Sequence, residues 1–321
     1  MAIDEQRHRF LYKVAQAYYG DEMTQQQVAD RFRISRSKVS RLLQEARAEG
    51  VVEIILVPPS GTMAEAEREL ERRYGLDEAV IVSVSNPHHL PSVKRELGPA
   101  AAECLLRSLS EGDVLTIAWG MSVLAMVDAM PSESFPNVTV AQISGGMGNG
   151  GERDHSCQLT LELARKLEAK PHLLQAPGVV STVEAARAIR SDDRIAETLA
   201  LAAAAKVAVV GLGLLSEDTM LLQEGTILST RDVQTLREAR AVGDVALRYL
   251  DEDGEPIDLE INDRTLGLTI EQIKEIPRVI GIAGGGPKFD VIRATLRGEI
   301  LDVLITDHAV AQKLLADSTA R

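Results

Sequence analysis

The sequence lacks the features that announce a disulfide scaffold, a metal site or a dinucleotide cofactor. Its two cysteines, Cys104 and Cys157, stand far apart and outside any C-x-x-C pattern, so we expect two buried thiols and no disulfide framework. The six histidines show no metal-ligand spacing such as H-E-x-x-H, which predicts no metal. Residues 211–213 (GLG) lack the third glycine of a dinucleotide fingerprint, and we predict no cofactor.

Long apolar runs are also missing. No stretch approaches the roughly 20 apolar residues of a membrane helix, and the first ten residues, MAIDEQRHRF, lack the apolar core of a secretion signal. The sequence therefore predicts a cytoplasmic protein with no membrane partner. Its 321 residues are enough for a large core and two domains.

Positive charge is scarce and unevenly placed. The chain has formal net charge −13, yet residues 1–60 hold nine Lys or Arg against eight Asp or Glu, which leaves −14 for the remainder. Within residues 31–47 there are six basic residues and one acidic residue. Because an acidic body repels nucleic acid, any DNA contact is expected to be local to the N-terminus.

The N-terminal segment has the pattern of three helices. Apolar spacing predicts a helix over residues 7–19 that Gly20 ends. Thr24 and Gln27 have the spacing of a capping box for a second helix. After a short turn at residues 33–34, Ser35 can cap a third helix that runs to about Glu49.

The third predicted helix has two different faces. Val39, Leu42, Leu43 and Ala46 share one arc, and the opposite arc carries Arg, Ser and Gln, which can bond to phosphates and guanine edges. A solvated basic face is the alternative, but the preceding helix and tight turn favour a helix-turn-helix. Residues 51–57 (VVEIILV) are predicted to form a strand, which would correspond to the wing of a winged helix. The residues predicted to contact DNA are Gln25, Ser35, Arg36, Ser37, Lys38, Ser40, Arg41 and Gln44.

A break at residues 58–61 (PPSG) separates this region from a second domain. Residues 63–74 are predicted to form a charged connector or dimer helix. We predict three segments: a DNA-binding domain at 1–57, a linker and connector helix at 58–75, and an effector domain at 76–321. Apolar runs that alternate with helical stretches predict an α/β domain with a mostly parallel, doubly wound sheet. The expected strands are 79–84, 113–118, 138–143, 172–175, 206–211, 245–250, 278–283 and 301–305, followed by a final helix at 308–317.

Glycine-rich turns follow several of these strands, at the edge where such sheets bind ligands. Glycines let backbone N–H groups approach an anion, a lysine suits a phosphate, and a carboxylate can accept hydrogen bonds from sugar hydroxyls. Each turn alone could be ordinary strand-to-helix punctuation, Lys288 a solvated lysine, and Asp251 part of a hairpin turn. The predicted effector-binding residues are Gly120, Met121, Ser122, Gly145, Gly146, Gly211, Gly213, Asp251, Gly285, Gly286 and Lys288.

Several long motifs together resemble the SorC family of bacterial transcriptional regulators, over essentially the whole chain. They are MTQQQVADRFRISRSKVSRLLQEAR, LTIAWGMS, QISGGMG, AVVGLGLL, GDVALRYLDEDG and RVIGIAGGGPKFDVIRATLRGEILDVLITDHAVAQKLL. The resemblance implies an effector domain similar to ribose-5-phosphate isomerase and glucosamine-6-phosphate deaminase that senses without turnover. It also implies phosphorylated sugar effectors, and dimers or tetramers that bind operators of catabolic operons.

Carried onto this sequence, the resemblance implies a phosphate-binding turn at Gly120, Met121 and Ser122. It implies a charge partner at Lys288 and a sugar-contacting carboxylate at Asp251. Three positions depart from the family pattern: Met121 replaces a polar or small residue, Ser122 a common Thr, and RYLD at residues 248–251 the commoner R-F-F-D.

These observations predict a DNA-binding regulator gated by a small sugar or sugar phosphate, without catalytic residues, acting as a homodimer or homotetramer. The alternative is a phosphosugar isomerase or deaminase with an accessory DNA-binding domain, in which Asp251, Glu224 or Asp307 would be the general base. A purely architectural DNA-binding protein is a weaker possibility, because it would not need the strand-end chemistry. An isomerase assay beside a DNA-binding assay with sugar phosphates separates the first two.

Overall fold

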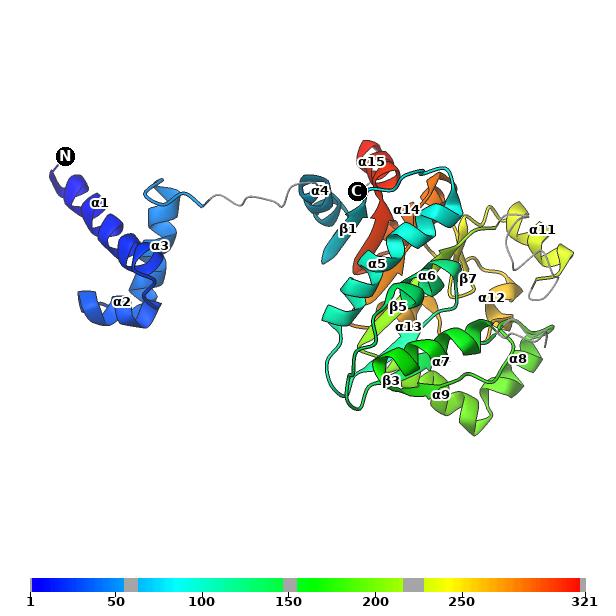
Figure 1. The fold of residues 1–321 in the computed structure, drawn as a ribbon. Coiled ribbons are helices and arrows are strands. Elements are labelled where there is room, and N and C mark those ends of the chain that lie inside the picture. Colours follow the sequence, from blue (N-terminus) through cyan, green and yellow to red (C-terminus); the bar gives the residue numbers. More distant parts are fainter. Residues whose placement is uncertain (1, 55–62, 147–154, 216–227, 318–321) are drawn as a thin grey trace. The chain divides into compact units, whose positions relative to one another are not determined.

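The structure, a computed structural model, describes residues 2–54, 63–146, 155–215 and 228–317. The chain divides into two compact units, residues 1–60 and residues 61–321 (Figure 1). The first is helical, and the second is built on a sheet covered by helices (Figure 1).

The N-terminal unit contains the three helices expected from the sequence. They are α1 (Ala2–Ala15), which continues into the π-helical turn η1 (Gln16–Gly20), α2 (Gln25–Phe32) and α3 (Arg36–Ala48). Both bonds of the predicted capping box are present, because the Thr24 hydroxyl accepts from the Gln27 N–H and the Gln27 side chain accepts from the Thr24 N–H. Ser35 caps α3 by accepting from the Lys38 N–H at 3.2 Å. Arg33, with a positive φ of 53°, ends α2, and the Ser35 cap begins α3, so only a short turn joins the two helices.

The predicted inward arc of α3 is confirmed. Val39, Leu42, Leu43 and Ala46 are buried, and they share one core cluster with apolar residues of α1 and α2. The strand predicted at residues 51–57 is wrong for residues 51–54, which form a bend at 51–52 and irregular backbone at 53–54. The Val52 N–H donates to the Ala46 carbonyl, so the chain folds back on the end of α3 instead of extending. Residues 55–57 lie outside the described residues, and the described part contains no wing strand.

The second unit is built on a sheet whose principal strands are all parallel, which confirms the predicted α/β class. The strand order is β1-β9-β8-β5-β2-β3-β4. Most predicted strands overlap the observed ones, but β4 begins and ends earlier than the predicted 172–175. The strands are β1 (Glu78–Val82), β2 (Val114–Ile117), β3 (Thr139–Gln142), β4 (Lys170–His172), β5 (Val207–Gly213), β8 (Val279–Ile282) and β9 (Val303–Asp307).

Helices cover both faces of this sheet (Figure 1). Helices α5 (Leu90–Ser108), α6 (Met121–Ala129) and α7 (His155–Leu167) cover one face. Alternate residues of β5 point to opposite sides: Val207 and Val209 pack with these helices, whereas Ala208 and Val210 pack on the other face. That other face is covered by α4 (Ala64–Tyr74), α9 (Asp193–Ala203), α13 (Ile270–Lys274), α14 (Phe289–Arg297) and α15 (His308–Ala316).

The smaller elements of the unit are α8 (Val183–Arg190), α11 (Thr230–Glu238), α12 (Glu260–Arg264) and the 3₁₀ turn η2 (Gly286–Lys288). Helix α4, the predicted connector, packs on the second unit. Its Leu70 is fully buried in the core below the sheet, and Arg73 donates to the carbonyls of Leu315 and Asp317. An apolar stripe therefore anchors helix α4 to the second unit, and charged side chains occupy the rest of its surface.

The strand predicted at residues 245–250 is wrong, because a hairpin stands in its place. Strand β6 (Gly243–Val245) pairs antiparallel with β5 and with β7 (Arg248–Leu250). The connection, Ala246 and Leu247, has positive φ at both residues, 51° and 68°. Turns of this kind favour Asn-Gly or Asp-Gly, so the Ala-Leu sequence carried no hairpin signal. The buried Arg248 guanidinium holds the hairpin down by donating to backbone carbonyls of residues 262–268.

Candidate functional site

The exposed face of α3 carries the side chains that the sequence assigns to DNA. Arg36, Ser37, Lys38, Arg41 and Gln44 are exposed on it. Ser40 and Gln25 are partly buried, and the Ser35 hydroxyl is exposed although it caps the helix. These residues therefore lie along α3, at its N-cap and at the start of α2.

The pairing of charges sharpens this face. Glu45 and Glu49 are turned toward α1, where Arg7 pairs with Glu45 and His8 lies 3.7 Å from Glu49. By contrast, Arg36, Lys38 and Arg41 form no ion pair within the described residues. The acidic groups of α3 are thus occupied on its inner side, and free cations remain on its outer side. This distribution of charge suits duplex DNA, a polyanion whose major groove is wide enough to admit an α-helix.

A second candidate site lies where β2 and β5 end side by side. Strand β2 leads through α6 to β3 on one side, and β5 has β8 on its other side, so the chain direction diverges between them. In open α/β sheets this is the position where ligands bind. A Cβ added at Gly211 of β5 would lie 3.6 Å from Val123 in the first turn of α6. The end of β5 therefore lies against the helix that starts at β2.

The N-terminus of α6 has unfilled hydrogen-bonding capacity. Gly120 occupies the cap position and provides no side-chain bond. The first N–H groups of a helix have no partner inside it, and no described residue supplies one for Met121, Ser122 or Val123. The Ser122 hydroxyl is buried, with 3% of the residue exposed, and has no hydrogen-bond partner in the described chain. Donors in this arrangement are suited to an anion.

Lys288 is buried beside the end of β5 and next to a carboxylate. Its ammonium group donates to the Leu212 carbonyl. Asp244 of β6 stands directly opposite Gly213 of β5, where an added Cβ would come within 1.8 Å of the Asp244 Oδ1 atom. Asp244 Oδ2 accepts from the Leu247 N–H at 3.0 Å, and Oδ1 has no partner among the described residues. A glycine at 213 is therefore required to make room for this carboxylate.

Burial places both groups close to their titration ranges. It raises the pKa of Asp244 to about 6, against the opposing effects of the Leu247 N–H and the charge of Lys288. Burial, with the charge of Lys94 as a second cause, lowers the pKa of Lys288 to about 8, and Asp244 opposes this shift. Both groups are therefore ionised together between roughly pH 6 and 8. In that range a charged acceptor oxygen and a charged ammonium group lie together in a buried site.

Asp251, the carboxylate assigned from the sequence, is not part of this cluster. Its Oδ1 atom accepts from the N–H groups of Asp253 and Glu255, both at 3.0 Å, and so closes its own turn. That turn packs at the far end of α14, because a Cβ at Gly254 would lie 2.2 Å from the Ala294 carbonyl. Lys288 precedes the other end of α14. Asp244 thus replaces Asp251 as the carboxylate beside the lysine, and its sequence signal is an acidic residue inside an apolar run.

The glycine turns differ in what their N–H groups can still bind. Those of Gly145 and Gly146 donate to the carbonyls of residues 266 and 176. Gly285 donates to Asp307 Oδ2 at 2.6 Å, whereas Gly286 is exposed and has no partner in the described part. Asp307 also caps α15, so its carboxylate is fully used. The available donors are therefore those of α6 and the turn before Lys288.

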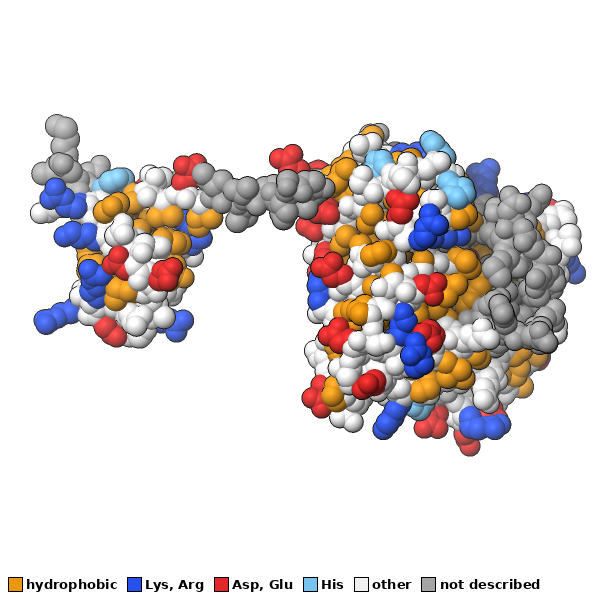
Figure 2. All heavy atoms as spheres, viewed as in Figure 1, with side chains coloured by type: hydrophobic (Ala, Val, Ile, Leu, Met, Phe, Trp, Pro, Cys, Tyr) orange, Lys and Arg blue, Asp and Glu red, His pale blue; other side chains and the backbone are white. Residues whose placement is uncertain are grey.

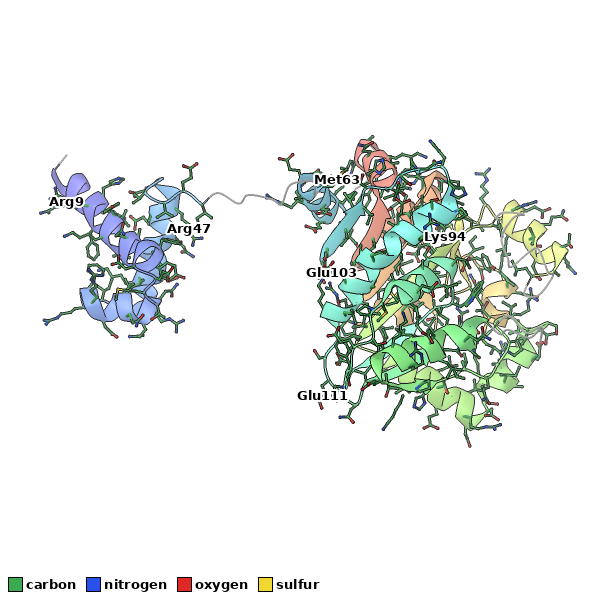
Figure 3. The ribbon with its side chains drawn as sticks, in the orientation of Figure 1. Arg9, Arg47, Met63, Lys94, Glu103 and Glu111 are labelled. Carbon is green, nitrogen blue, oxygen red and sulfur yellow. The ribbon has the colours of Figure 1, made fainter. Side chains whose placement is uncertain are left out.

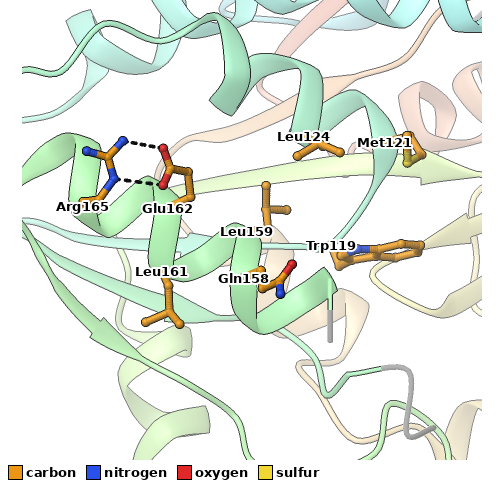
Figure 4. A pocket seen from close by; sticks show the side chains of 8 residues that line it. All are labelled: Trp119, Met121, Leu124, Gln158, Leu159, Leu161, Glu162 and Arg165. Atoms are coloured by element: carbon orange, nitrogen blue, oxygen red, sulfur yellow. Dashed lines mark hydrogen bonds and ion pairs between the residues drawn. The ribbon is translucent and has the colours of Figure 1, made fainter. Parts of the chain in front are cut away.

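An apolar groove of about 610 Å³ opens on the outer side of the same turn, between α6 and α7 (Figure 4). Its cationic side chain, Arg165, is paired with Glu162 at 2.6 Å and is not free for an anion. Figure 2 shows hydrophobic side chains on the face that carries α6 and α7, where Met121, Leu124 and Leu161 are partly exposed. The groove shares Trp119 and Met121 with the turn and presents an apolar wall to it.

Two further properties bear on the class of protein. Within the described residues, no helix combines the length and the apolar character that crossing a bilayer requires. No cluster of His, Cys, Asp or Glu in the same residues could hold a metal ion.

A helix-turn-helix unit followed by a parallel α/β unit is the architecture of a transcriptional regulator with a ligand-binding domain. Comparison with known proteins agrees. Residues 59–316 match the family described as "Putative sugar-binding domain", and residues 13–49 match sigma-70 region 4. The chain belongs to this sugar-binding family of transcriptional regulators, the SorC family.

Individual relatives cover nearly the whole chain. The chain is 30% identical to the transcriptional regulator LsrR of Klebsiella pneumoniae over 312 residues, 95% of this chain and 92% of that protein. It is 28% identical to the deoxyribonucleoside regulator of Bacillus subtilis, over 98% of this chain and 100% of that one. The crystal structure of the full-length sorbitol operon regulator SorC from Klebsiella pneumoniae superposes with a TM-score of 0.73 at 28% identity, covering 96% and 99% of the two chains.

Proposed function

We propose that the protein regulates transcription of a carbohydrate-catabolism operon, and that a small phosphorylated sugar bound at the ends of β2 and β5 controls its affinity for operator DNA. One observation carries this proposal. The uncapped N-terminus of α6, with the buried and unpartnered Ser122 hydroxyl, lies at the strand edge that also holds Lys288 and Asp244. Burying unpaired donors costs free energy, which an anionic ligand would recover.

The two parts of the site suit the two ends of a sugar phosphate. The N–H groups of residues 121–123 and the Ser122 hydroxyl would hold the phosphate oxygens. The free Oδ1 atom of Asp244 would accept from a sugar hydroxyl, and Lys288 would donate to an oxygen of the same ligand. Met121, the departure from the family pattern, would contribute its N–H while its side chain lines the apolar groove.

Control of DNA binding requires two states that bind the effector differently. A tenfold change in operator affinity corresponds to about 1.4 kcal/mol of coupling. The relatives support a regulatory role, since those compared are regulators of transcription and one is named for a sorbitol operon. A regulator of bacterial operators works in the cytoplasm, where the DNA is.

A homodimer or homotetramer follows from the recognition unit. One helix-turn-helix covers a half-site, and a symmetric pair covers two. Light scattering at micromolar concentration, with and without operator DNA, tests this. A monomer under both conditions would contradict it.

The function as a whole is tested in two steps. A thermal-shift screen of sugars and sugar phosphates finds the effector, because a ligand that binds the native state raises the melting temperature. Fluorescence anisotropy of an operator selected from a random DNA pool then measures affinity with and without that effector. We expect a sugar phosphate to be a hit and to change the operator affinity at least several-fold. Binding to neither DNA nor any sugar would overturn the proposal.

Asp244 also supports an alternative function, that of an enzyme. A buried carboxylate with a pKa of about 6 beside a lysine has the properties of a general base in an isomerase or deaminase. Of the bases suggested by the sequence, Asp307 and Asp251 are engaged in capping and turn bonds, and Glu224 lies outside the described residues. Incubating the sugar-phosphate hit with the protein and following it by NMR decides: conversion that an Asp244→Asn variant abolishes would establish the enzyme.

A further inference from the structure

Lys94, in the first turns of α5, is a cation without an evident partner. Its side chain is half-buried, and burial lowers its pKa. No hydrogen bond or ion pair connects it to any residue that the structure describes. The nearby Glu96 carboxylate is already occupied by the N–H and hydroxyl of Ser85, at 2.8 and 2.6 Å. A partly desolvated ammonium group without a nearby anion is energetically unfavourable, so the placement of Lys94 requires a functional explanation.

The packing of α5 against α6 fixes where Lys94 lies. The two helices approach each other closely at Gly98, where an added Cβ would come within 2.4 Å of the Ala125 carbonyl. Both helices follow parallel strands of one sheet and cover the same face, so they run in the same direction. Lys94 lies one turn before Gly98 on the same side of α5, and Ser122 lies about one turn before Ala125. Lys94 is therefore level with the first turn of α6.

Figure 3 shows Lys94 at the end of α5 that lies beside α6, far along the helix from Glu103. Interactions of η2 with α5 give a second indication of where Lys94 lies. The charge of Lys94 reaches Lys288 and is a cause of that lysine's lowered pKa. The turn before Lys288 is also packed against the start of α5, since a Cβ at Gly285 would lie 2.3 Å from the Leu90 side chain. Two lysines and a helix N-terminus thus converge, with Asp244 as the carboxylate that influences Lys288.

We propose that Lys94 is a specificity-determining residue of the effector site, which contacts the phosphate of the ligand and selects phosphorylated over unphosphorylated sugars. The inference rests on the proposed function, because it assigns one end of the same ligand. The N–H groups at the start of α6 and the buried Ser122 hydroxyl hold the phosphate oxygens, and Lys94 supplies the full charge that those neutral donors lack. Lys288, whose ammonium already donates to the Leu212 carbonyl, is left to the sugar end with Asp244. A lysine inside a helix carries no strand-end signal, and the sequence alone does not single it out.

The test uses the full-length protein and inorganic phosphate as the probe. Thermal shift is titrated with phosphate at constant ionic strength, balanced with chloride, for the wild type, Lys94→Met and Lys94→Gln. Methionine keeps the apolar stem of the lysine, and glutamine guards against a packing effect of either substitution. Arg95→Met is the matched control, because Arg95 is the exposed neighbouring cation on the same helix.

We expect the wild type and Arg95→Met to show the same saturable stabilisation by phosphate. Both Lys94 variants should need about tenfold or more phosphate for half the effect, the scale of one lost charge-assisted bond. Lys94→Arg should recover most of the affinity. Unchanged phosphate affinity in both Lys94 variants overturns the inference, as does a wild type that responds to phosphate no more than to chloride.

A paired measurement separates this inference from the proposed function. The effector found by screening is compared with its unphosphorylated counterpart on the wild type and Lys94→Met. The inference expects the preference for the phosphorylated form to shrink about tenfold in the variant. If an unphosphorylated sugar binds both proteins equally and still changes operator affinity, the role of Lys94 is refuted while regulation by a sugar stands.

Discussion

The two candidate sites treat charge in opposite ways. On α3, Arg36, Lys38 and Arg41 project into solvent from one helix and have no partner among the described residues. At the strand edge, Asp244 and Lys288 are buried and come from segments more than forty residues apart in the chain. Solvent keeps the first group charged at little cost, whereas burial brings the second group close to its titration point. The first arrangement suits a large polyanion that arrives from solvent, and the second suits a small ligand that becomes enclosed.

The contrast implies that substitutions should act differently at the two sites. Removing an exposed cation should weaken DNA contact without disturbing the fold. Removing a buried group should alter its partners as well as the ligand, so its effect should be larger and should depend on pH. Four predictions test this difference, beginning with the largest expected effect.

Lys288→Ala should weaken effector binding by the scale of a charge-assisted hydrogen bond, about 1.5–3 kcal/mol. Operator binding without effector should remain nearly intact, so the variant binds DNA but responds poorly to its sugar phosphate. Calorimetric titration of the effector gives the affinity. Lys274→Ala, which removes an exposed lysine from the same unit, is the control and should bind as the wild type does. Equal affinities for wild type and Lys288→Ala would show that Lys288 does not contact the effector.

Arg36→Ala and Arg41→Ala should each weaken operator binding by about 1–3 kcal/mol if the residue reads a base. A residue that contacts only phosphate should lower affinity evenly across sequences and reduce the salt dependence. Both variants should melt like the wild type, because neither side chain is packed. Anisotropy titrations at several salt concentrations give the result, and Arg9→Ala on α1 is the control for charge. Wild-type affinity in both variants would remove α3 as the recognition helix.

Effector affinity should be greatest between about pH 6 and 8. Above about 8, free Lys288 loses its proton, and a ligand that needs the charged ammonium group as donor must bind together with a proton, so affinity should fall by up to about tenfold per pH unit. Below about 6, Asp244 becomes protonated and its carboxylate no longer accepts as an anion. The phosphate itself also gains a proton near pH 6, so the acid limb has two causes.

Calorimetry across this range gives the profile, and the alkaline limb should disappear in Lys288→Met. The Lys94 pKa is also lowered by burial, so Lys94→Met is measured in parallel to separate the two lysines. A flat profile in the wild type from pH 6 to 9 would contradict the buried, titrating pair.

The smallest effect concerns the independence of the two units. Thr24→Ala removes the capping box of α2 and should cost the N-terminal unit about 1 kcal/mol. Thr269→Ala removes the equivalent box of α13 and should affect only the sheet unit. Denaturant unfolding, followed by operator binding and by effector binding as separate readouts, compares them. If each variant lowers both readouts equally, the units do not unfold separately and the contrast between them fails.

How far the sequence predicts each region follows from the same physics. The helix-turn-helix is local: Thr24, Gln27 and Ser35 mark helix starts, and the period of Val39, Leu42, Leu43 and Ala46 marks the inner face. The structure confirms these features. The parallel sheet is also visible, because each buried strand is a short apolar run bounded by turn residues.

The geometry of the candidate effector site could be predicted only in part, because it depends on pairings between distant segments. The sequence predicts the turns after β2 and β8 and the carboxylate of Asp251 as effector contacts, and the structure places Asp244 beside Lys288 while Asp251 closes its own turn. That difference comes from the Ala246-Leu247 turn, because alanine and leucine do not indicate the positive φ angles that both residues adopt. Hydrogen bonds of Arg248 and of the Asp244 carboxylate hold the turn in this conformation. The partnership of Asp244 with Gly213 is a matter of β-strand register, which no local pattern shows.

In the proposed mechanism, a sugar phosphate at the strand edge controls the affinity of the exposed helix α3 for operator DNA. The most direct test measures operator affinity by anisotropy as the effector is titrated, for wild type, Arg41→Ala and Lys288→Ala in one experiment. We expect a several-fold change in wild-type operator affinity. Arg41→Ala should bind DNA more weakly at every effector concentration but keep the response. Lys288→Ala should bind DNA normally, with the response shifted to at least about tenfold higher effector. A wild type whose operator affinity is unchanged at saturating effector would contradict it.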